Sequence, residues 1–211
     1  MLEHEKVLWS QGIQLIAGID EVGRGCLFGD VVAASVILPP NLEIKGIDDS
    51  KKLTPKKREE LFDQITKQAI AIGVGKVDAK TIDQINIKQA ARLAMKQAVL
   101  IMNISPQVLL IDAEKVDLTI PQRSIIKGDT VSQSIAAASI IAKVTRDRMC
   151  EEWDQLYPLY GIKQHKGYAT KLHREMIRLH GPSPLHRQSF LGNLLQETLF
   201  EFEMDFTKME G

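Results

Sequence analysis

Apolar runs of strand length occupy the first part of the chain. Residues 15–19 and 31–38 form two such runs, and Gly23, Gly25 and Gly29 lie between them. Short apolar runs bounded by glycine or proline are typical of buried strands. We therefore expect two neighbouring strands joined by a glycine-rich connection.

Helical and strand patterns alternate through the rest of the chain. Thr54 and Pro55 suit the N-cap and the first position of a helix. In chain order we expect a helix from residue 54, a strand over 69–77, one long helix over 81–102, a strand over 108–111, an edge strand over 124–127, a helix over 132–149, a loop over 161–167, and helices over 170–179 and 190–202. Strands that follow one another directly and then through helices predict an α/β fold with a mixed central sheet flanked by helices.

The helix expected over 132–149 carries an unusually small apolar stripe. Its members are Ser134, Ala136, Ala137, Ala138, Ser139 and Ala142. Small side chains allow close approach between packed elements. We therefore expect this helix to lie directly against the sheet.

Length and composition fit one folded domain. The chain has 211 residues, of which 44% are hydrophobic and 26% charged. These values are ordinary for a globular domain. We expect a single domain over 1–211, with an α/β core over about 13–157 and a helical C-terminal extension over about 158–211.

Neither a membrane segment nor a disulfide framework is indicated. The apolar runs are shorter than the ~18 residues that a bilayer-spanning helix requires, and the first residues are too polar for a signal peptide. Cys26 and Cys150 are too few for a disulfide framework or a zinc quartet. We therefore expect a cytoplasmic protein with reduced thiols and no membrane partner.

Charge is balanced overall but unevenly distributed. The 27 Lys and Arg residues match the 27 Asp and Glu residues. Basic residues cluster over 51–58 and outnumber acidic ones over 143–187, whereas acidic residues concentrate after 196. Two interpretations remain open on charge alone: a surface that faces a polyanion, or ordinary solvated surface charge.

Four acidic residues stand where apolar elements stop. Asp20 and Glu21 follow the first strand, Asp112 follows the strand over 108–111, and Asp129 precedes the small-residue helix. Carboxylates gathered at strand ends repel one another unless a cation lies among them. Hard oxygen ligands without cysteine pairs favour Mg²⁺ or Mn²⁺. The alternative is that each acid is a turn or cap residue, with Asp129 capping the next helix.

One face of the same helix carries a hydroxyl and two cations. Ser139, Lys143 and Arg146 recur at helical spacing, so they share a face that suits a phosphate backbone. A solvated helix face is the competing interpretation. The histidines of the C-terminal part are spaced too loosely to predict a metal site, and we interpret them as structural or adjacent to phosphate.

Several ordered motifs together identify a family resemblance. They occupy residues 18–25 (GIDEVGRG), 49–53 (DSKKL), 136–147 (AAASIIAKVTRD) and 165–168 (HKGY). From about Ile16 to Phe190 the chain closely resembles bacterial ribonuclease HII. The resemblance implies a ribonuclease H-like fold and endonucleolytic hydrolysis of the RNA strand of RNA–DNA hybrids, including single ribonucleotides embedded in duplex DNA. It also implies 5′-phosphate and 3′-hydroxyl products, a Mn²⁺ or Mg²⁺ cofactor and, by our expectation, a monomer.

The resemblance also implies roles for individual residues. The family's catalytic, metal-binding carboxylates match Asp20, Glu21, Asp112 and Asp129. Its ribose-sensing turn matches Gly23, Arg24 and Gly25, and its junction-reading tyrosine matches Tyr168. Two metal ions about 3.5–4 Å apart hydrolyse a phosphodiester without a side-chain nucleophile, and glycines allow a close backbone approach to a 2′-hydroxyl.

The chain departs from the family pattern beside that turn. Cys26, Phe28 and Asp30 stand where proline, alanine and proline are usual. We expect these changes to loosen the turn, to add negative charge near a polyanion and to lower activity. They keep open a second interpretation, a nucleic-acid-binding homologue with impaired catalysis. A third, ribonuclease HIII, carries a separate N-terminal domain for which the segment before the first strand is too short.

Overall fold

A five-stranded mixed sheet forms the centre of the protein. The computed structural model describes residues 1–192 and 194, and its strands lie in the order β3-β2-β1-β4-β5. Their bounds are β1 (Ile16–Val22), β2 (Val31–Ile37), β3 (Ala71–Val77), β4 (Val108–Asp112) and β5 (Gln122–Ile125). β1 pairs antiparallel with β2 and parallel with β4. The predicted mixed sheet is confirmed.

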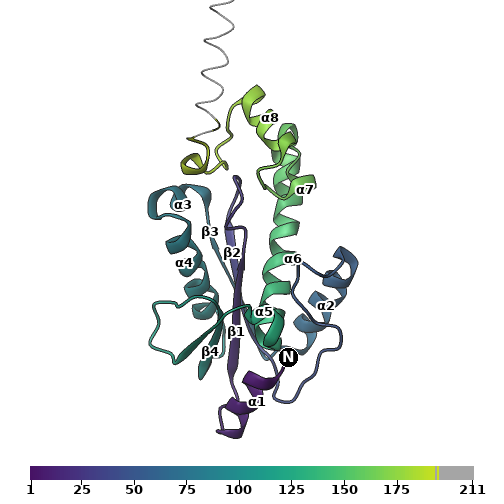
Figure 1. Ribbon diagram of the computed structural model, residues 1–211, viewed down its shortest axis with the longest axis vertical. Coiled ribbons are helices and arrows are strands. Elements are labelled where there is room, and N and C mark those ends of the chain that lie inside the picture. Colours follow the sequence, from purple (N-terminus) through teal and green to yellow (C-terminus); the bar gives the residue numbers. More distant parts are fainter. Residues whose placement is uncertain (193, 195–211) are drawn as a thin grey trace, which may run out of the picture.

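Helices cover both faces of this sheet. They are α1 (Glu3–Ser10), α2 (Pro55–Gln68), α3 (Ala79–Ile85), α4 (Ile87–Leu100), α5 (Gly128–Val131), α6 (Gln133–Leu156), α7 (Ile162–His165) and α8 (Lys171–His180). Figure 1 shows α3 and α4 on one side of the sheet and α6 with α2 on the other. Short 3₁₀ turns, η1 (Pro158–Tyr160) and η2 (Gln188–Phe190), complete the C-terminal part.

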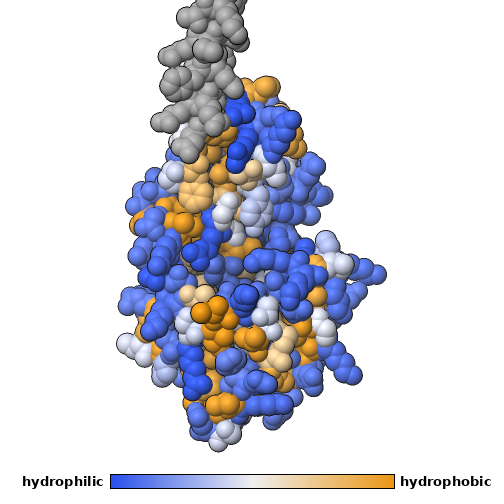
Figure 2. Space-filling view, in the orientation of Figure 1, coloured by the Kyte–Doolittle hydropathy of each residue, from blue (hydrophilic) through white to orange (hydrophobic). Residues whose placement is uncertain are grey.

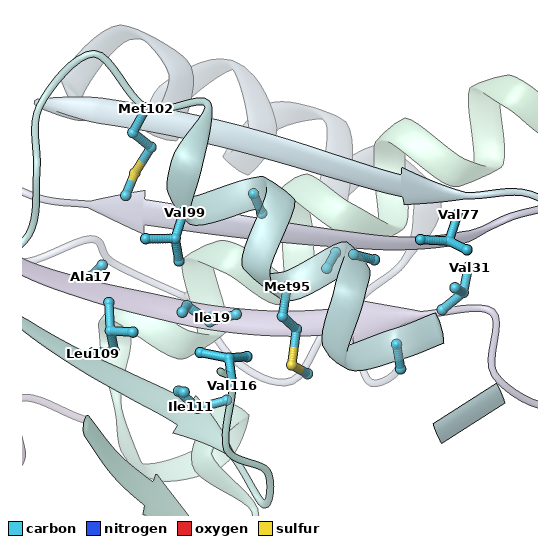
Figure 3. Packing of buried hydrophobic residues seen from close by; sticks show 14 of the residues in the cluster. Ala17, Ile19, Val31, Val77, Met95, Val99, Met102, Leu109, Ile111 and Val116 are labelled. Atoms are coloured by element: carbon cyan, nitrogen blue, oxygen red, sulfur yellow. The ribbon is translucent and has the colours of Figure 1, made fainter. Parts of the chain in front are cut away.

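The core under α4 forms because its apolar face meets small residues of β3. Met95 points from α4 toward Ile19 of β1 and toward Val116 of the loop that follows β4 (Figure 3). A methyl group on Gly75 of β3 would overlap the carbonyl oxygen of Ala94. Glycine therefore lets the backbones of β3 and α4 approach closely.

The opposite core confirms the prediction for the small-residue helix. Ala136, Ala137 and Ala138 of α6 are completely buried against the sheet. A methyl group on Gly18 of β1 would overlap the backbone of Ser134. The small residues thus bring α6 into direct contact with the strand that carries Asp20.

Two sequence predictions of local structure were wrong. The long helix expected over 81–102 is divided into α3 and α4 at Asn86, whose φ is 65°. The Asn86 side chain accepts hydrogen bonds from the N–H groups of Lys88 and Gln89, at 3.0 and 3.2 Å, and so begins a new helix. The loop expected over 161–167 contains the single-turn helix α7.

Helix α6 extends beyond the sheet to the C-terminal part. Figure 1 shows it running from α5 to α7 and α8, beside the turn that joins β1 to β2. A third apolar cluster there includes Phe28, Trp153, Tyr160 and Leu191. Most of the helix expected over 190–202 lies outside the described residues.

The surface seen in Figure 2 is mainly hydrophilic, with hydrophobic residues in separate patches. Exposed apolar side chains include Ile126, Leu156 and Leu179. Within residues 1–192 and 194, we find no helix with the length and apolar character needed to cross a membrane.

Candidate active site

Asp20 lies where β1 loses one neighbour. β1 pairs with β4 only as far as Ile19, although its pairing with β2 continues to Val22. The Asp20 side chain is almost fully buried, and its Oδ1 accepts a hydrogen bond from the N–H of Glu21 at 2.8 Å. Burial raises the pKa of Asp20 well above its usual value, and the charges of Glu21 and Asp112 raise it further.

Glu21 is the second carboxylate at this edge. Burial raises its pKa, the guanidinium of Arg24 lowers it, and the charges of Asp112 and Glu114 raise it. Nη1 of Arg24 lies 3.2 Å from Oε1 of Glu21. Arg24 therefore partly neutralises the acidic edge from the adjoining turn.

Asp112 and Asp129 complete the predicted set. Asp112 ends β4, and Asp129 lies in the first turn of α5. The pKa of Asp129 is raised by burial and then by the charges of Asp49 and Asp112, while Lys51 lowers it. Asp20 and Asp112 directly follow the paired residues Ile19 and Ile111, and Gly128, which precedes Asp129, donates to Oδ1 of Asp112. The predicted acids thus lie at one edge of the sheet, where the charge of Asp112 raises the pKa of the other three.

The alternative in which Asp129 caps the next helix is wrong. The N-cap of α6 is Ser132, whose side chain accepts a hydrogen bond from the N–H of Ile135. The N-cap of α5 is Lys127, in the left-handed conformation with φ 55°. The carboxylate of Asp129 is thus not required for either helix start.

Asp49 is a further acid of this region that sequence reasoning did not single out. Its charge and a hydrogen bond to Asp129 both raise the pKa of Asp129. The available signal was its place in the motif over 49–53. The same motif carries Lys51, which lowers the pKa of both Asp129 and Tyr168 and therefore lies near both.

The donor chemistry of the acidic edge fits a hard divalent cation. All four predicted acids offer carboxylate oxygens, and their mutual repulsion favours a cation among them. In the part of the chain that the structure describes, no three or more His, Cys, Asp or Glu side chains form a ready-made cage for a metal ion. Mg²⁺ commonly binds to one or two carboxylates, with waters and substrate phosphates supplying the other ligands. The arrangement fits that open type of site.

The glycine-rich turn follows the acids directly. Gly23 has φ 93°, a conformation that favours glycine, and a methyl group on it would overlap Nε of Arg146. Gly25 has open space beside it. Gly23 is therefore required by the fold, whereas Gly25 leaves room for a ligand to approach the backbone.

The three polar residues expected on one face of α6 have different environments. Oγ of Ser139 lies 2.9 Å from Oγ of Ser50, and a hydrogen bond from Ser139 lowers the pKa of Asp20. Nζ of Lys143 forms an ion pair with Asp147 at 2.6 Å. Ser139 thus lies beside Asp20, whereas Lys143 is paired with an acid of its own helix.

The prediction that Arg146 faces a phosphate backbone from an exposed helix face was wrong. Arg146 is buried, with only 1% of its surface exposed to solvent. Its guanidinium donates hydrogen bonds to the carbonyl oxygens of Phe28, Asp30 and Lys166. The small glycine at position 23 lets α6 and the turn approach, which places the arginine inside.

The expectation that Cys26, Phe28 and Asp30 loosen the turn is not supported by their environments. Cys26 and Phe28 are completely buried. Burial and the charge of Asp78 raise the pKa of Asp30, while Arg146 lowers it together with Lys76 and Arg187. Phe28 fills a hydrophobic cluster, and Asp30 lies near buried cations, so neither residue is simply added bulk or charge.

Three of the histidines form one buried cluster. The rings of His165 and His173 stack with centroids 4.2 Å apart, and Nε2 of His173 lies 3.1 Å from Nε2 of His186. The N–H of Ser183 donates to Nδ1 of His186 at 2.9 Å. His186 therefore carries its proton on Nε2 and donates to His173, whose Nδ1–H then donates to the carbonyl oxygen of Tyr168 at 2.9 Å. The cluster supports the backbone of Tyr168.

Tyr168 itself lies at the surface. Its residue surface is 41% exposed, and its N–H donates to the carbonyl oxygen of His165 at 3.0 Å. The loop over 165–168 also contacts the turn, since the N–H of Leu27 donates to the carbonyl oxygen of Gly167 at 2.8 Å. An exposed ring thus stands on a loop that is fixed to the glycine-rich turn.

Comparisons with known proteins agree on one family. The family described as Ribonuclease HII matches residues 17–192. A protein named Ribonuclease HII from Alkaliphilus metalliredigens (strain QYMF) is 60% identical over 201 residues, covering 92% of this chain and 98% of the relative. Another of that name, from Enterococcus faecalis (strain ATCC 700802 / V583), is 55% identical over 190 residues, covering 90% of this chain and 74% of the relative.

Solved structures show the same fold. The ribonuclease H2 of Pyrococcus horikoshii OT3 matches with a TM-score of 0.72 at 26% identity, covering 87% of this chain and 98% of that chain. The ribonuclease HII solved in complex with PCNA from Archaeoglobus fulgidus matches with a TM-score of 0.72 at 28% identity, covering 85% and 96%. A structure titled Bst-RNase HIII in complex with Mn²⁺ shares the fold at 20% identity, with a TM-score of 0.64 and coverage of 88% and 70%.

Proposed function

The chain belongs to the ribonuclease HII family, and on that premise we propose that it cleaves the RNA strand of RNA–DNA hybrids and cuts at single ribonucleotides embedded in duplex DNA. Membership of the family makes it an endonuclease. The proposal concerns its substrates, the metal it uses and the role of each site residue.

One observation carries the proposal. Asp20 and Asp112 directly follow Ile19 and Ile111, the last pair of β1 and β4, and Oδ1 of Asp112 accepts a hydrogen bond from Gly128, the neighbour of Asp129. Acids from three separate segments of the chain therefore stand at one edge of the sheet. A fold that holds four carboxylates this close retains repulsion that a bound cation would relieve. We assign Asp20, Glu21, Asp112 and Asp129 as the ligands of Mg²⁺ or Mn²⁺. Bound there, two such ions would supply activation of a water and stabilisation of the leaving oxygen.

The chain's own residues position the scissile phosphate. The carboxylates stand at the edge where β1 and β4 part, and Ser139 supports Asp20 from α6. Hydrolysis forms a bond between the water oxygen and phosphorus and breaks the bond between phosphorus and O3′. The O3′ atom takes up a proton, which leaves a 3′-hydroxyl and a 5′-phosphate.

Two elements beside the acids provide selectivity for ribonucleotides. The turn of Gly23, Arg24 and Gly25 offers backbone groups with open space beside Gly25, which suits contact with a 2′-hydroxyl. The exposed ring of Tyr168 suits stacking on the nucleotide next to the ribonucleotide. We also assign phosphate contacts to Lys51, whose charge lowers the pKa of Asp129 and of Tyr168, and to Lys143, which pairs with Asp147.

The test is a mapped cleavage assay. A DNA duplex with one ribonucleotide and an RNA–DNA hybrid are each incubated with Mn²⁺, Mg²⁺ or EDTA, and an all-DNA duplex serves as the control. The proposal requires cuts at ribonucleotides with at least one of the two metals and none with EDTA. A protein that binds both substrates and cuts neither would support the alternative of a binding homologue with impaired catalysis.

A further inference from the structure

Arg146 joins two segments that lie far apart in the sequence. Its Nη2 donates to the carbonyl oxygen of Phe28 at 3.0 Å, and its Nε donates to that of Asp30 at 3.0 Å. Its Nη1 donates to the carbonyl oxygen of Lys166 at 2.8 Å. One guanidinium therefore fixes both the chain that leaves the glycine-rich turn and the loop that presents Tyr168.

Both segments also pack against this side chain through glycine. A methyl group on Gly23 would overlap Nε of Arg146. One on Gly167 would press on the carbonyl oxygen of Phe28, at 3.0 Å, and would only touch Nη2 of Arg146, at 3.5 Å. The guanidinium further lies 5.8 Å from the ring centroid of Trp153. Gly23 thus clears the space that Arg146 occupies, and Gly167 lets the second loop lie against Phe28 and the guanidinium.

We propose that Arg146 is a positioning residue that sets the spacing between the ribose-reading turn of Gly23–Gly25 and the junction-reading ring of Tyr168. The inference rests on the function proposed above. Hydrogen bonds from a charged donor are stronger than neutral ones, and a buried carbonyl that loses its donor is costly. Loss of the guanidinium therefore frees the two segments to separate, so that a substrate no longer engages both at once.

The test compares two charge-removing variants on the same helix. Arg146→Gln removes the guanidinium that hydrogen-bonds to both segments. Arg148→Gln removes an equal charge from an exposed side chain that pairs with Glu59. Cleavage of the single-ribonucleotide duplex and of the long RNA–DNA hybrid is measured for each, with the salt dependence of binding. Arg146→Lys keeps the charge but loses the fork geometry and serves as a second variant.

The expected result is a change in selectivity without a change in salt dependence. Arg146→Gln should lower the ratio of single-ribonucleotide to hybrid cleavage by about fivefold or more, the least that loss of a stacked ring is expected to cost. In a Tyr168→Ala background, Arg146→Gln should have little further effect on this ratio, because Arg146 acts on selectivity by positioning the Tyr168 ring and that ring is already absent. Arg148→Gln should leave the ratio unchanged.

Three results would overturn the inference. A salt slope reduced by about 1 in Arg146→Gln would make it a direct phosphate contact. Arg146→Gln could also lower cleavage of both substrates equally and add its effect to that of Tyr168→Ala. This result would mean that Arg146 does not set the spacing between the turn and Tyr168. Unfolding of both Arg146→Gln and Arg146→Lys below the assay temperature would make Arg146 a folding residue only. Failure of the unaltered protein to cut at ribonucleotides would instead overturn the proposed function, whichever result the variants give.

Discussion

The backbone N–H of Gly128 donates a hydrogen bond to Oδ1 of Asp112 at 2.7 Å. This contact ties the end of β4 to the first residue of α5, and the next residue in the chain is Asp129. One carboxylate therefore helps to position the segment that carries another. The contact uses Oδ1 and does not involve Oδ2 of Asp112.

Asp112→Asn should abolish most of the hydrolysis and leave the fold intact. The asparagine carbonyl can still accept from Gly128, whereas the negative charge at the centre of the four acids is lost. We expect turnover to fall by several orders of magnitude while hybrid binding persists, because binding rests largely on phosphate contacts. Asp117→Asn is the matched control, since Asp117 is an exposed acid paired with Lys96. Near-normal turnover by Asp112→Asn would remove this residue from the proposed site.

The main strands were predictable because their buried residues form apolar runs in the sequence, and Asp112 ends β4 as expected. The runs over 31–38 and 108–111 correspond to β2 and β4 within a residue or two at their ends. β1 extends three residues beyond the run that predicted it, because its pairing with β2 continues through Val22. Polar strand residues such as Asp20 and Glu21 give no apolar signal, although antiparallel pairing retains them in the sheet.

Arg146 and Asn86 could not be predicted, because their roles depend on tertiary geometry. Helical spacing placed Arg146 on a face with Ser139 and Lys143, and only the approach of Gly23 shows that this part of the face is inside. Asn86 interrupts an otherwise helical pattern through a positive φ that no local sequence rule required. The contact between Asp49 and Asp129 likewise joins residues that are distant in the chain.

Phe28→Ala should destabilise the protein. Phe28 is completely buried, and its ring lies edge-on to those of Trp153 and His186, with centroids 5.8 and 4.8 Å away. Replacing a buried phenylalanine with alanine costs about 3–5 kcal/mol of unfolding free energy. Chemical unfolding would measure this loss, with Leu159→Ala as an exposed control. An unchanged unfolding free energy would mean that the cluster can close over the cavity.

The same packing argues against a gain in stability from restoring the three residues that are usual in the family. The variant combines Cys26→Pro, Phe28→Ala and Asp30→Pro. It would remove the Phe28 ring from its cluster, and it would remove the N–H that residue 26 donates to the carbonyl oxygen of Gly23. A proline at a compatible site contributes only about 0.4–1 kcal/mol, which does not offset the cavity. We expect a lower melting temperature for the triple variant. A higher melting temperature would restore the view that these residues loosen the turn.

Stability should fall as the pH drops from about 6.5 toward 4. Burial, together with the charge of the neighbouring histidines, lowers the pKa of both His173 and His186 from 6.5 to about 4. The unfolded chain therefore binds more protons than the folded one between these values, so stability is full above 6.5 and is lost on acidification. The loss is roughly 3 kcal/mol at most for each histidine. Urea unfolding at several pH values measures it.

His186→Asn is the variant for this pH dependence, because asparagine offers an acceptor to Ser183 but does not titrate. Its unfolding free energy should be lower at pH 7 and should change less between pH 7 and pH 4 than that of the unaltered protein. His180→Gln removes an exposed histidine and should leave the profile as it is. A profile for His186→Asn as steep as that of the unaltered protein would show that other groups cause the acid sensitivity.

Tyr168→Ala should lower activity in a way that depends on the substrate. The ring is partly exposed, and α8 is capped by Thr170, so the side chain is not needed to start that helix. Stacking of a base on an aromatic ring is worth about 1–3 kcal/mol, which corresponds to roughly 5- to 150-fold in rate. A single embedded ribonucleotide offers one junction, so its cleavage should fall by that factor. A long hybrid offers many registers that rely on the turn and on phosphate contacts, so its cleavage should fall less.

Tyr168→Phe separates the ring from the hydroxyl. Phenylalanine keeps the stacking surface, so this variant should cleave both substrates nearly as the unaltered protein does. The melting temperature should change little in either variant, because the backbone hydrogen bonds of position 168 with His165 and His173 remain and only a side-chain hydrogen bond with Cys26 is lost. Equal losses on the two substrates by Tyr168→Ala, together with a lower melting temperature, would mean that the ring supports the loop and does not read the junction.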